Sequence, residues 1–330
     1  MVLPQLAGRA ELNMASMDPK LEEFLSDAPV FLQPWWLEAV APGRWDYVTV
    51  RKGNEIAAVL PYSFKKRLGW TFIESPANTP YLGPWLRTTT AKQAHRLSEE
   101  KELYSSLIES LPPHAHFHQN FHPQVTNWLP FYWKGFSQQT IYTYRLADTS
   151  DLDAIWEGMR ENIRRNIRKA RKTLTVESND DFSTVLALHR MTWKRQGGEF
   201  ACSDEEMFRI FKACRKHGAG KLLVAKDAEN RAHCAAYFIW DRTALYYYFC
   251  GSDPSLRNSG ANALIIWEGI RLAAGLGKIF DFEGSVQEPI ERFFRAFGAC
   301  QVPFFALTRT KSLPAVALRE VFRRLRAVRK

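Results

Sequence analysis

The sequence lacks several features that would assign a protein to a class at once. No apolar run approaches the roughly 20 residues of a membrane-spanning helix, and the start "MVLPQLAGRAELNMASMDPK" has no continuous apolar segment of the kind found in signal peptides. No CxxC pair occurs among the 5 cysteines, which argues against a zinc site or a secreted disulfide framework. We therefore expect a cytoplasmic protein without a metal, in which residues 1–17 form a flexible leader.

Length and charge indicate the organisation and a class of partner. The chain has 330 residues, which exceeds the usual size of one domain, so two domains are expected. The hydrophobic fraction of 46% and the charged fraction of 24% are ordinary for a globular protein. The net charge of +10 is concentrated in residues 160–172 and from Arg309 onward, which favours an anionic partner.

An internal repeat defines the two domains. Residues 45–84 are expected to form a strand, a turn, a strand, a basic turn and a third strand, and residues 221–260 follow the same order. A helix follows each time, at 91–111 and at 260–276, and then a strand, a short aromatic helix ending in Gly, and a last strand. The chain is thus predicted to duplicate one α+β unit, with domains at 18–148 and 149–310 that join near Asp148–Asp151.

The segment 279–307 contains two candidate functional carboxylates. Residues 279–283 alternate apolar and acidic, as a strand with one buried face does, so Asp281 and Glu283 share the other face. After a turn, four apolar residues recur at helical spacing before Gly298, which suits a helix C-cap: Ile290, Phe293, Phe294 and Phe297. The aromatic residues indicate core packing, while the two acids indicate either a solvated strand face or a site.

Two basic segments suggest contacts with anions. Residues 152–174 are predicted to form one helix with an apolar stripe and a basic stripe that includes Arg164 and Arg168. Repulsion within this stripe costs about a few tenths of a kcal/mol per close pair, so it is predicted to bind a polyanion such as tRNA; the alternative is a solvated face. Residues 311–330 are expected to form a basic amphipathic tail that either lies on an anionic bilayer or packs as a terminal helix.

Three motifs carry a resemblance to a known superfamily: "ENIRRNIRKARK", "YYYFCGSDPSLRNSGAN" and "FDFEGS…IERFFRAFG". With the order of the repeated unit, they resemble the GNAT N-acyltransferases. Two such units in tandem, over roughly residues 30–310, resemble the bacterial Fem-type peptidoglycan aminoacyl transferases and methicillin-resistance-like proteins. The resemblance implies an α+β (mixed α/β) fold of two tandem GNAT-like domains, each a mixed, mostly antiparallel sheet flanked by helices, and an acyl-CoA donor.

The resemblance also implies roles for particular residues. The pyrophosphate of the donor would lie at the start of a helix, where amides are unpaired, against Arg257, Ser259, Gly260 and Asn262, and a backbone N–H of Cys250 or Gly251 would face the oxyanion. Asp281 or Glu283 would take the proton of the amine, and Tyr247 or a neighbouring tyrosine would return one to the leaving group. The first domain would be an acceptor lobe with a degenerate donor site, with candidate residues Trp36, Asn78, Tyr81 and His118.

One departure from the family pattern bears on the donor. Where Fem-type enzymes carry F-K-x-x-F-G, this sequence has Phe294 at the Lys position, followed by Arg295. We therefore expect an enzyme that transfers an acyl or aminoacyl group from acyl-CoA to an amine of a cell-envelope precursor or nucleotide-linked sugar. The alternatives are a tRNA-dependent Fem-type transferase and a catalytically silent protein that binds an anionic polymer or a membrane. The tail would allow peripheral contact with the inner face of the membrane.

Overall fold

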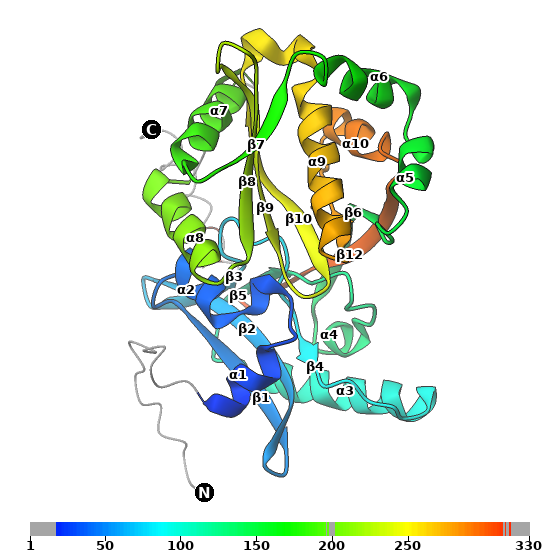
Figure 1. The fold of residues 1–330 in the computed structure, drawn as a ribbon. Helices are drawn as coiled ribbons and strands as arrows, with labels where there is room; N and C mark the ends of the chain where they lie inside the picture. Colours follow the sequence, from blue (N-terminus) through cyan, green and yellow to red (C-terminus); the bar gives the residue numbers. More distant parts are fainter. Residues whose placement is uncertain (1–17, 196, 198–201, 313, 315–316, 318–330) are drawn as a thin grey trace, which may run out of the picture. The chain divides into compact units, whose positions relative to one another are not determined.

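The structure is a computed structural model that describes residues 18–195, 197, 202–312, 314 and 317. The chain divides into two compact units, one comprising residues up to Thr140 and from Phe305 onward, the other comprising Ile141–Phe304 (Figure 1). No helix of the described residues is long and apolar enough to cross a membrane. The predicted leader at 1–17, and the predicted tail apart from residues 311, 312, 314 and 317, lie outside the described residues.

Unit 1 is a mixed sheet with helices. Its strand order is β1-β2-β3-β5-β12, and β4 pairs with β2 on the side. Only β3 and β5 run parallel among the pairings described here. Its elements are α1 (Pro19–Leu25), η2 (Val30–Leu32), α2 (Pro34–Val40), β1 (Trp45–Lys52), β2 (Glu55–Arg67), β3 (Trp70–Glu74), β4 (Trp85–Leu86), α3 (Gln93–Ser110), β5 (His116–Asn120) and α4 (Leu129–Trp133). The strand β12 (Cys300–Thr310) enters unit 1 at Phe305.

The strands of unit 2 follow one another in the order β6-β11-β10-β9-β8-β7. The pair β10 and β11 is parallel, and the other pairs in this order are antiparallel. Its elements are β6 (Ser137–Leu146, which begins in unit 1), α5 (Leu152–Gly158), α6 (Glu161–Ala170), β7 (Thr175–Asn179), α7 (Phe182–Arg195), α8 (Asp204–Lys216), β8 (Gly220–Lys226), β9 (Ala232–Trp240), β10 (Ala244–Ser252), η3 (Pro254–Ser259), α9 (Ala261–Gly275), β11 (Ile279–Asp281) and α10 (Glu288–Arg295).

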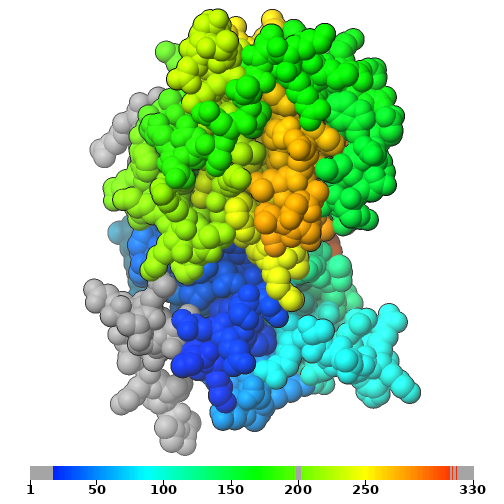
Figure 2. All heavy atoms as spheres, in the orientation of Figure 1, coloured from blue at the N-terminus to red at the C-terminus, as the bar shows by residue number. Residues whose placement is uncertain are grey.

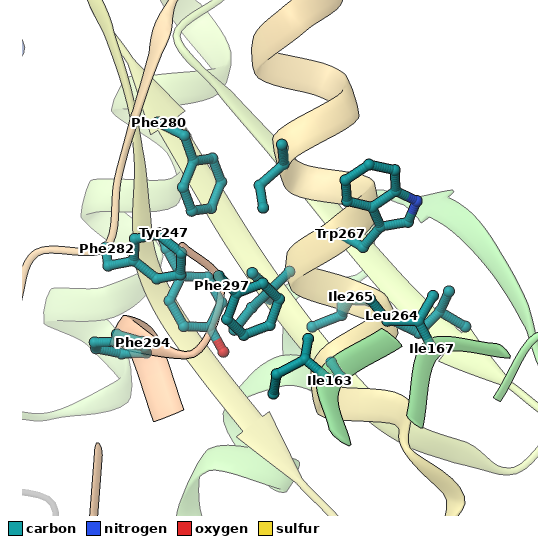
Figure 3. Packing of buried hydrophobic residues seen from close by; sticks show 14 of the residues in the cluster. Ile163, Ile167, Tyr247, Leu264, Ile265, Trp267, Phe280, Phe282, Phe294 and Phe297 are labelled. Atoms are coloured by element: carbon teal, nitrogen blue, oxygen red, sulfur yellow. The ribbon is translucent and has the colours of Figure 1, made fainter. Parts of the chain in front are cut away.

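Helices cover both faces of the unit 2 sheet. Figure 1 shows α7 and α8 on one face and α9 on the other, and successive side chains of a strand alternate between these faces. Tyr237 of β9 packs against Phe182 of α7, whereas its neighbour Phe238 belongs to the cluster with α6 and α9. In that cluster, Phe280 and Tyr247 lie with the α10 segment on one side and the aliphatic residues of α9 on the other (Figure 3). In the space-filling view, α5 and α6 lie beside α9 (Figure 2).

The predicted fold is confirmed. Both strand–turn–strand–turn–strand segments, the helices α3 and α9, and the short helix α10 followed by a strand lie where the sequence predicts them, within the few residues by which helix ends vary. Unit 2 begins at Ile141, whereas the predicted second domain begins at residue 149, and β12 ends in unit 1. The acceptor and donor roles of the two domains stay predictions.

Two predicted elements differ from the structure. The single helix over 152–174 is wrong, because the chain is extended at Met159 and Arg160, and α6 begins anew at Glu161. At this break the N–H of Arg160 donates to the carbonyl of Ala296 at 2.9 Å, a contact that a continuous helix would not allow. The strand predicted over 279–283 ends at Asp281, because Glu283 and Gly284 have left-handed φ values of 59° and 70°.

Candidate active site

The candidate site lies where β10 and β11 part in unit 2. The parallel pairing covers three residue pairs, from Ala244 with Ile279 to Tyr246 with Asp281. Beyond it the chain after β11 follows β6, since the N–H of Phe282 donates to the carbonyl of Tyr144 at 2.9 Å. Within the described part of the chain, residues 247–252 of β10 therefore have β9 on one side and no strand on the other, and we call this second side the free edge of β10. Unpaired backbone groups on such an edge can bind a ligand.

A β-bulge lies at the start of the free edge. Tyr247 is opposite Phe238 and Phe249 is opposite Tyr237, so Tyr248 is the extra residue. Bulges are common next to active sites, where they redirect a side chain. The side chain of Tyr248 is half-buried, and burial raises its pKa well above the ordinary value, with a further contribution from the charge of Glu283.

Glu283 is an acid with an unsatisfied buried oxygen. Its Oε1 is buried and has no hydrogen-bond partner among the described residues, and its φ of 59° is strained for a side chain other than glycine. Burial raises the pKa of Glu283 well above its ordinary value, and the charge of Asp281 raises it further. The Glu283 charge in turn adds to the burial that raises the pKa of Cys250. A carboxyl with a raised pKa suits proton transfer near neutral pH.

Asp281 differs from the prediction, because it is a buried structural residue. Its side chain is 0% exposed and accepts hydrogen bonds from Thr143 at 2.5 Å, from Arg145 at 2.7 Å and from the N–H of Glu283 at 2.8 Å. A carboxylate with three donors and no exposure has little freedom to take a proton from a substrate. Its hydrogen bond to the N–H of Glu283 instead helps to fix the left-handed turn.

Tyr247 also lies in the core rather than at the free edge. Its ring is in edge contact with Phe294, with centroids 6.1 Å apart, and burial raises its pKa well above the ordinary value (Figure 3). Its neighbour Tyr246 donates a hydrogen bond to Asp241 at 2.8 Å and is 0% exposed. The half-buried Tyr248 is therefore the tyrosine placed to act on a ligand at the free edge.

The predicted pyrophosphate site lies at the start of α9. Arg257 and Asn262 are exposed there, and Ser259 Oγ accepts from the N–H of Ala261 at 3.3 Å. Lys169 of α6 donates to the carbonyl of Asn258 at 2.6 Å, which adds a positive charge beside the helix start. These residues fit an anion. Gly260 lies close to α6, since an added Cβ would be 2.4 Å from the carbonyl oxygen of Asn166. Its predicted role in phosphate binding stays a prediction.

The two predicted oxyanion donors face opposite ways. The N–H of Asp253 donates to the carbonyl of His233 in β9, at 3.0 Å. Because backbone groups alternate along a strand, Gly251 also faces β9, and Cys250 faces the free edge. The structure therefore favours the N–H of Cys250 over that of Gly251.

The position of the family lysine is apolar. Phe294 is 7% exposed and packs against Phe282, with ring centroids 5.1 Å apart. The adjacent Arg295 turns away and donates to Glu291 of the same helix at 2.7 Å. No cation in this helix therefore takes the place of the lysine.

The two arginines predicted to bind a polyanion are paired within the chain. Arg164 bonds Glu157 at 2.6 Å and Glu161 at 3.0 Å, and Arg168 also bonds Glu161. The two acids lower the repulsion that motivated the prediction. The role of the two arginines in binding an anion stays a prediction, with less physical support than the sequence gave reason to expect.

The candidate acceptor residues of unit 1 are mostly in its core. Trp36 and Tyr81 are both 0% exposed, and Trp36 donates to Thr79 at 3.1 Å, so neither ring offers a face to a ligand. Asn78 has a φ of 60°, which a turn requires, and His118 hydrogen-bonds Thr308 at 2.9 Å. Aromatic residues serve cores and binding surfaces alike, and here packing accounts for them.

Several residues at this site had no role in the sequence analysis. Arg145 holds Asp281, and His189 and Thr192 of α7 contact the end of β10. Trp193 of the same helix donates to His189. His189, Thr192 and Trp193 recur at the spacing of one helix face, which was the available signal. Among the described residues, no group of three or more His, Cys, Asp or Glu could hold a metal ion.

One family model matches part of unit 2. Residues 157–288 are similar to the family described as an acetyltransferase (GNAT) domain. The match covers α6, the strands β7–β11, and Glu283. No curated protein sequence matches the chain.

Solved structures resemble nearly the whole chain in fold. FemX is 14% identical, with 88% of this chain and 96% of that chain covered and a TM-score of 0.64. The C-terminal domain of a protein named as a lysylphosphatidylglycerol synthetase, from Agrobacterium fabrum, is 11% identical, with 92% and 94% covered and a TM-score of 0.56. A tandem GNAT protein from the clavulanic acid biosynthesis pathway is 8% identical, with 89% and 94% covered and a TM-score of 0.51. At these identities the likeness concerns the fold.

Proposed function

We propose that the chain is an N-acyltransferase, because residues 157–288 match the model of a GNAT acetyltransferase domain and the chain resembles FemX in fold. It moves an acyl or aminoacyl group from acyl-CoA to an amine of a cell-envelope precursor or a nucleotide-linked sugar. The observation that supports this most is the unpaired, buried carboxyl of Glu283 beside the free edge of β10. A base without a structural partner, next to backbone donors without a strand, suits acyl transfer.

The residues divide the chemistry as follows. The amine nitrogen attacks the thioester carbonyl, so a C–N bond forms and the carbonyl oxygen becomes an oxyanion that faces the N–H of Cys250. Glu283 takes one proton from the attacking nitrogen. The C–S bond then breaks, and the CoA thiolate receives a proton from Glu283 through water or from Tyr248. In the second case the proton that Glu283 took returns through water to the Tyr248 phenolate, so both residues regain their starting state.

The start of α9 is proposed to hold the phosphates of the donor. Arg257 and Lys169 supply positive charge, and the helix start supplies unpaired amides. The likeness to a protein named as a lysylphosphatidylglycerol synthetase, whose name states a lipid product, supports a cell-envelope acceptor. We also propose that the protein works in the cytoplasm, at or near the inner face of the membrane, where such acceptors are made.

A calorimetric titration with acetyl-CoA tests the proposed donor. Asn262→Asp adds a carboxylate at an exposed position in the first turn of α9, where it favours the helix and opposes the pyrophosphate. We expect saturable binding to the intact protein and binding weakened about tenfold or more in this variant, the effect of ~1.4 kcal/mol. Asn54→Asp, exposed on a turn of unit 1, makes the same charge change and should leave the affinity unaltered.

Two other outcomes identify the alternatives. An intact protein that does not bind acetyl-CoA would overturn the acyl-CoA donor, and titration with charged tRNA would then decide whether it is a tRNA-dependent transferase. The apolar Phe294 and the paired Arg164 give that alternative less support. Binding to neither donor would indicate a catalytically silent protein.

A further inference from the structure

A second group of residues acts on the free edge of β10, from the side of α7. His189 Nδ1 lies 2.5 Å from the carbonyl oxygen of Cys250, and Trp193 Nε1 lies 2.7 Å from His189 Nε2. An indole N–H can only donate, so His189 Nε2 accepts and the proton of the neutral ring is on Nδ1. His189 therefore donates to the carbonyl of Cys250, and Trp193 fixes the tautomer that allows it.

The packing around His189 leaves it little freedom. Its ring lies against Phe249, with centroids 3.9 Å apart. An added Cβ at Gly251 would lie 2.1 Å from the backbone nitrogen of His189, so α7 approaches β10 as closely as a glycine permits. One turn later, Thr192 Oγ1 accepts from the N–H of Ser252 at 3.0 Å and lies 3.2 Å from the carbonyl oxygen of that residue.

The contacts from α7 determine which backbone groups on the free edge of β10 can still bind a ligand. Cys250 and Ser252 face away from β9, since the N–H of Asp253 bonds the carbonyl of His233. His189 covers the carbonyl of Cys250, and Thr192 bonds the N–H and lies beside the carbonyl of Ser252. The N–H of Cys250 is left to face a ligand. A carbonyl dipole beside a developing oxyanion would oppose it, so covering that carbonyl favours the oxyanion.

We propose that His189, oriented by Trp193, is a positioning residue that turns the free edge of β10 into a site of hydrogen-bond donors and directs the Cys250 N–H at the carbonyl oxygen of the acyl donor. This inference rests on the proposed function, because it assumes that a thioester binds at this edge. Burial lowers the pKa of His189, although the hydrogen bond to Cys250 opposes that effect. A lowered pKa keeps the ring neutral at physiological pH, as the Trp193 hydrogen bond requires.

The test compares two variants of similar shape. His189→Asn retains an N–H near the position of Nδ1, whereas His189→Leu does not. Acetyl-CoA labelled with ¹³C at the thioester carbonyl is bound to the full-length protein and to each variant, and the carbonyl stretching band is recorded by infrared difference spectroscopy. We expect the band to lie at lower frequency on the intact protein than in free acetyl-CoA, to return toward the free value in His189→Leu, and to remain shifted in His189→Asn.

Affinity for CoA without the acetyl group separates positioning from a loss of fold. CoA has no carbonyl at the reaction centre, so its dissociation constant should agree within about twofold among the three proteins, because a positioning residue acts on the carbonyl alone. Trp193→Phe keeps the ring but lacks the indole N–H, and should give a band between those of the intact protein and His189→Leu. A band in His189→Leu equal to that of the intact protein would overturn the inference and leave the proposed function in place. Acetyl-CoA that does not bind to the intact protein would overturn both.

Discussion

Each unit contains one parallel strand pair, β3 with β5 in unit 1 and β10 with β11 in unit 2. The two pairs differ in whether the chain beyond the paired residues is hydrogen-bonded again to the partner strand. In unit 1, β3 pairs with β5 from Phe72 to Glu74, and the chain after β3 returns to β5. There Leu82 exchanges two hydrogen bonds of 2.7 Å with Asn120 and His122. In unit 2, β10 and β11 part after three residue pairs, and nothing similar rejoins them among the described residues.

The segments that follow the two parallel strand pairs differ in whether their side chains are fully packed. In unit 1 the residue after the strand pair, Phe121, is 0% exposed and packs against Phe131, with centroids 5.0 Å apart. In unit 2 the chain after β11 instead presents Glu283, with an unpartnered buried oxygen. Two units of similar strand order can therefore differ here, one with a closed core and the other with an unsatisfied buried carboxyl oxygen, and such a group in a native structure calls for an explanation. The proposed function gives that explanation as a substrate.

The largest effect is expected from Glu283→Gln, which removes the proposed base and keeps the shape. The rate of acyl transfer should fall about 10²- to 10⁴-fold, the usual contribution of a general base, while acetyl-CoA still binds. Because the base must be ionised and its pKa is raised, the rate of the intact protein should rise with pH through a value above 4.5, and the variant should lack that limb. Steady-state rates between acidic and mildly basic pH measure both.

The pH dependence of the unfolding free energy of Glu283→Gln tests independently whether the pKa of Glu283 is raised. An unfolded Glu ionises at its ordinary pKa and the folded Glu283 at a higher one, so ionisation opposes folding and stability falls as pH rises between the two values. Glu283→Gln should therefore be more stable than the intact protein at pH above the raised value, and lose this advantage below 4.5. An unchanged rate in Glu283→Gln would remove the functional half of the comparison between the units.

The next effect concerns Arg145, which we expect to stabilise unit 2 without a part in the chemistry. Arg145→Leu leaves Asp281 buried and unpaired, which should cost about 3–5 kcal/mol of unfolding free energy, measured by chemical denaturation. Asp281→Asn keeps Oδ1, which accepts from Thr143 and from the N–H of Glu283, and it leaves the charge of Arg145, 11% exposed, without its partner. It should cost less, because the unpaired charge is then the more exposed of the two. If Asp281→Asn instead matched Glu283→Gln in rate with its fold intact, Asp281 would be catalytic, as the sequence suggested.

The sequence predicts what depends on local pattern. Both strand repeats, α9 and α10 follow from periodicity and from glycines at turns, and they lie as expected. The site depends instead on pairs that are distant in the chain: Arg145 and Asp281 are 136 residues apart, and His189 and Cys250 are 61 apart. No local pattern indicates that one acid of the Asp281 and Glu283 pair is held and the other is unpartnered.

The aromatic residues also show what a single sequence does not predict, because residues expected at a site lie in the core. The sequence analysis expected Trp36 to bind the acceptor and Tyr247 to return a proton, yet both side chains are buried. Whether such a side chain is buried depends on the elements that pack against it, and the sequence pattern alone does not predict those contacts. The missed residue His189 lies in α7, for which the sequence analysis made no prediction.

The smallest effect comes from one glycine substitution made in each unit. Gly83 has a φ of 101°, and an added Cβ would lie 2.8 Å from the ring of Phe121. Gly83→Ala should therefore cost about 1–3 kcal/mol of stability, as overpacking does, and leave acetyl-CoA affinity unchanged. Gly251→Ala pushes α7 from β10 and should weaken acetyl-CoA binding as well. Chemical denaturation and calorimetric titration of both variants compare the two units. Weaker acetyl-CoA binding by a folded Gly83→Ala would mean that the strand pair of unit 1 takes part in donor binding. In that case the proposed division between a packing unit and a functional unit would be wrong.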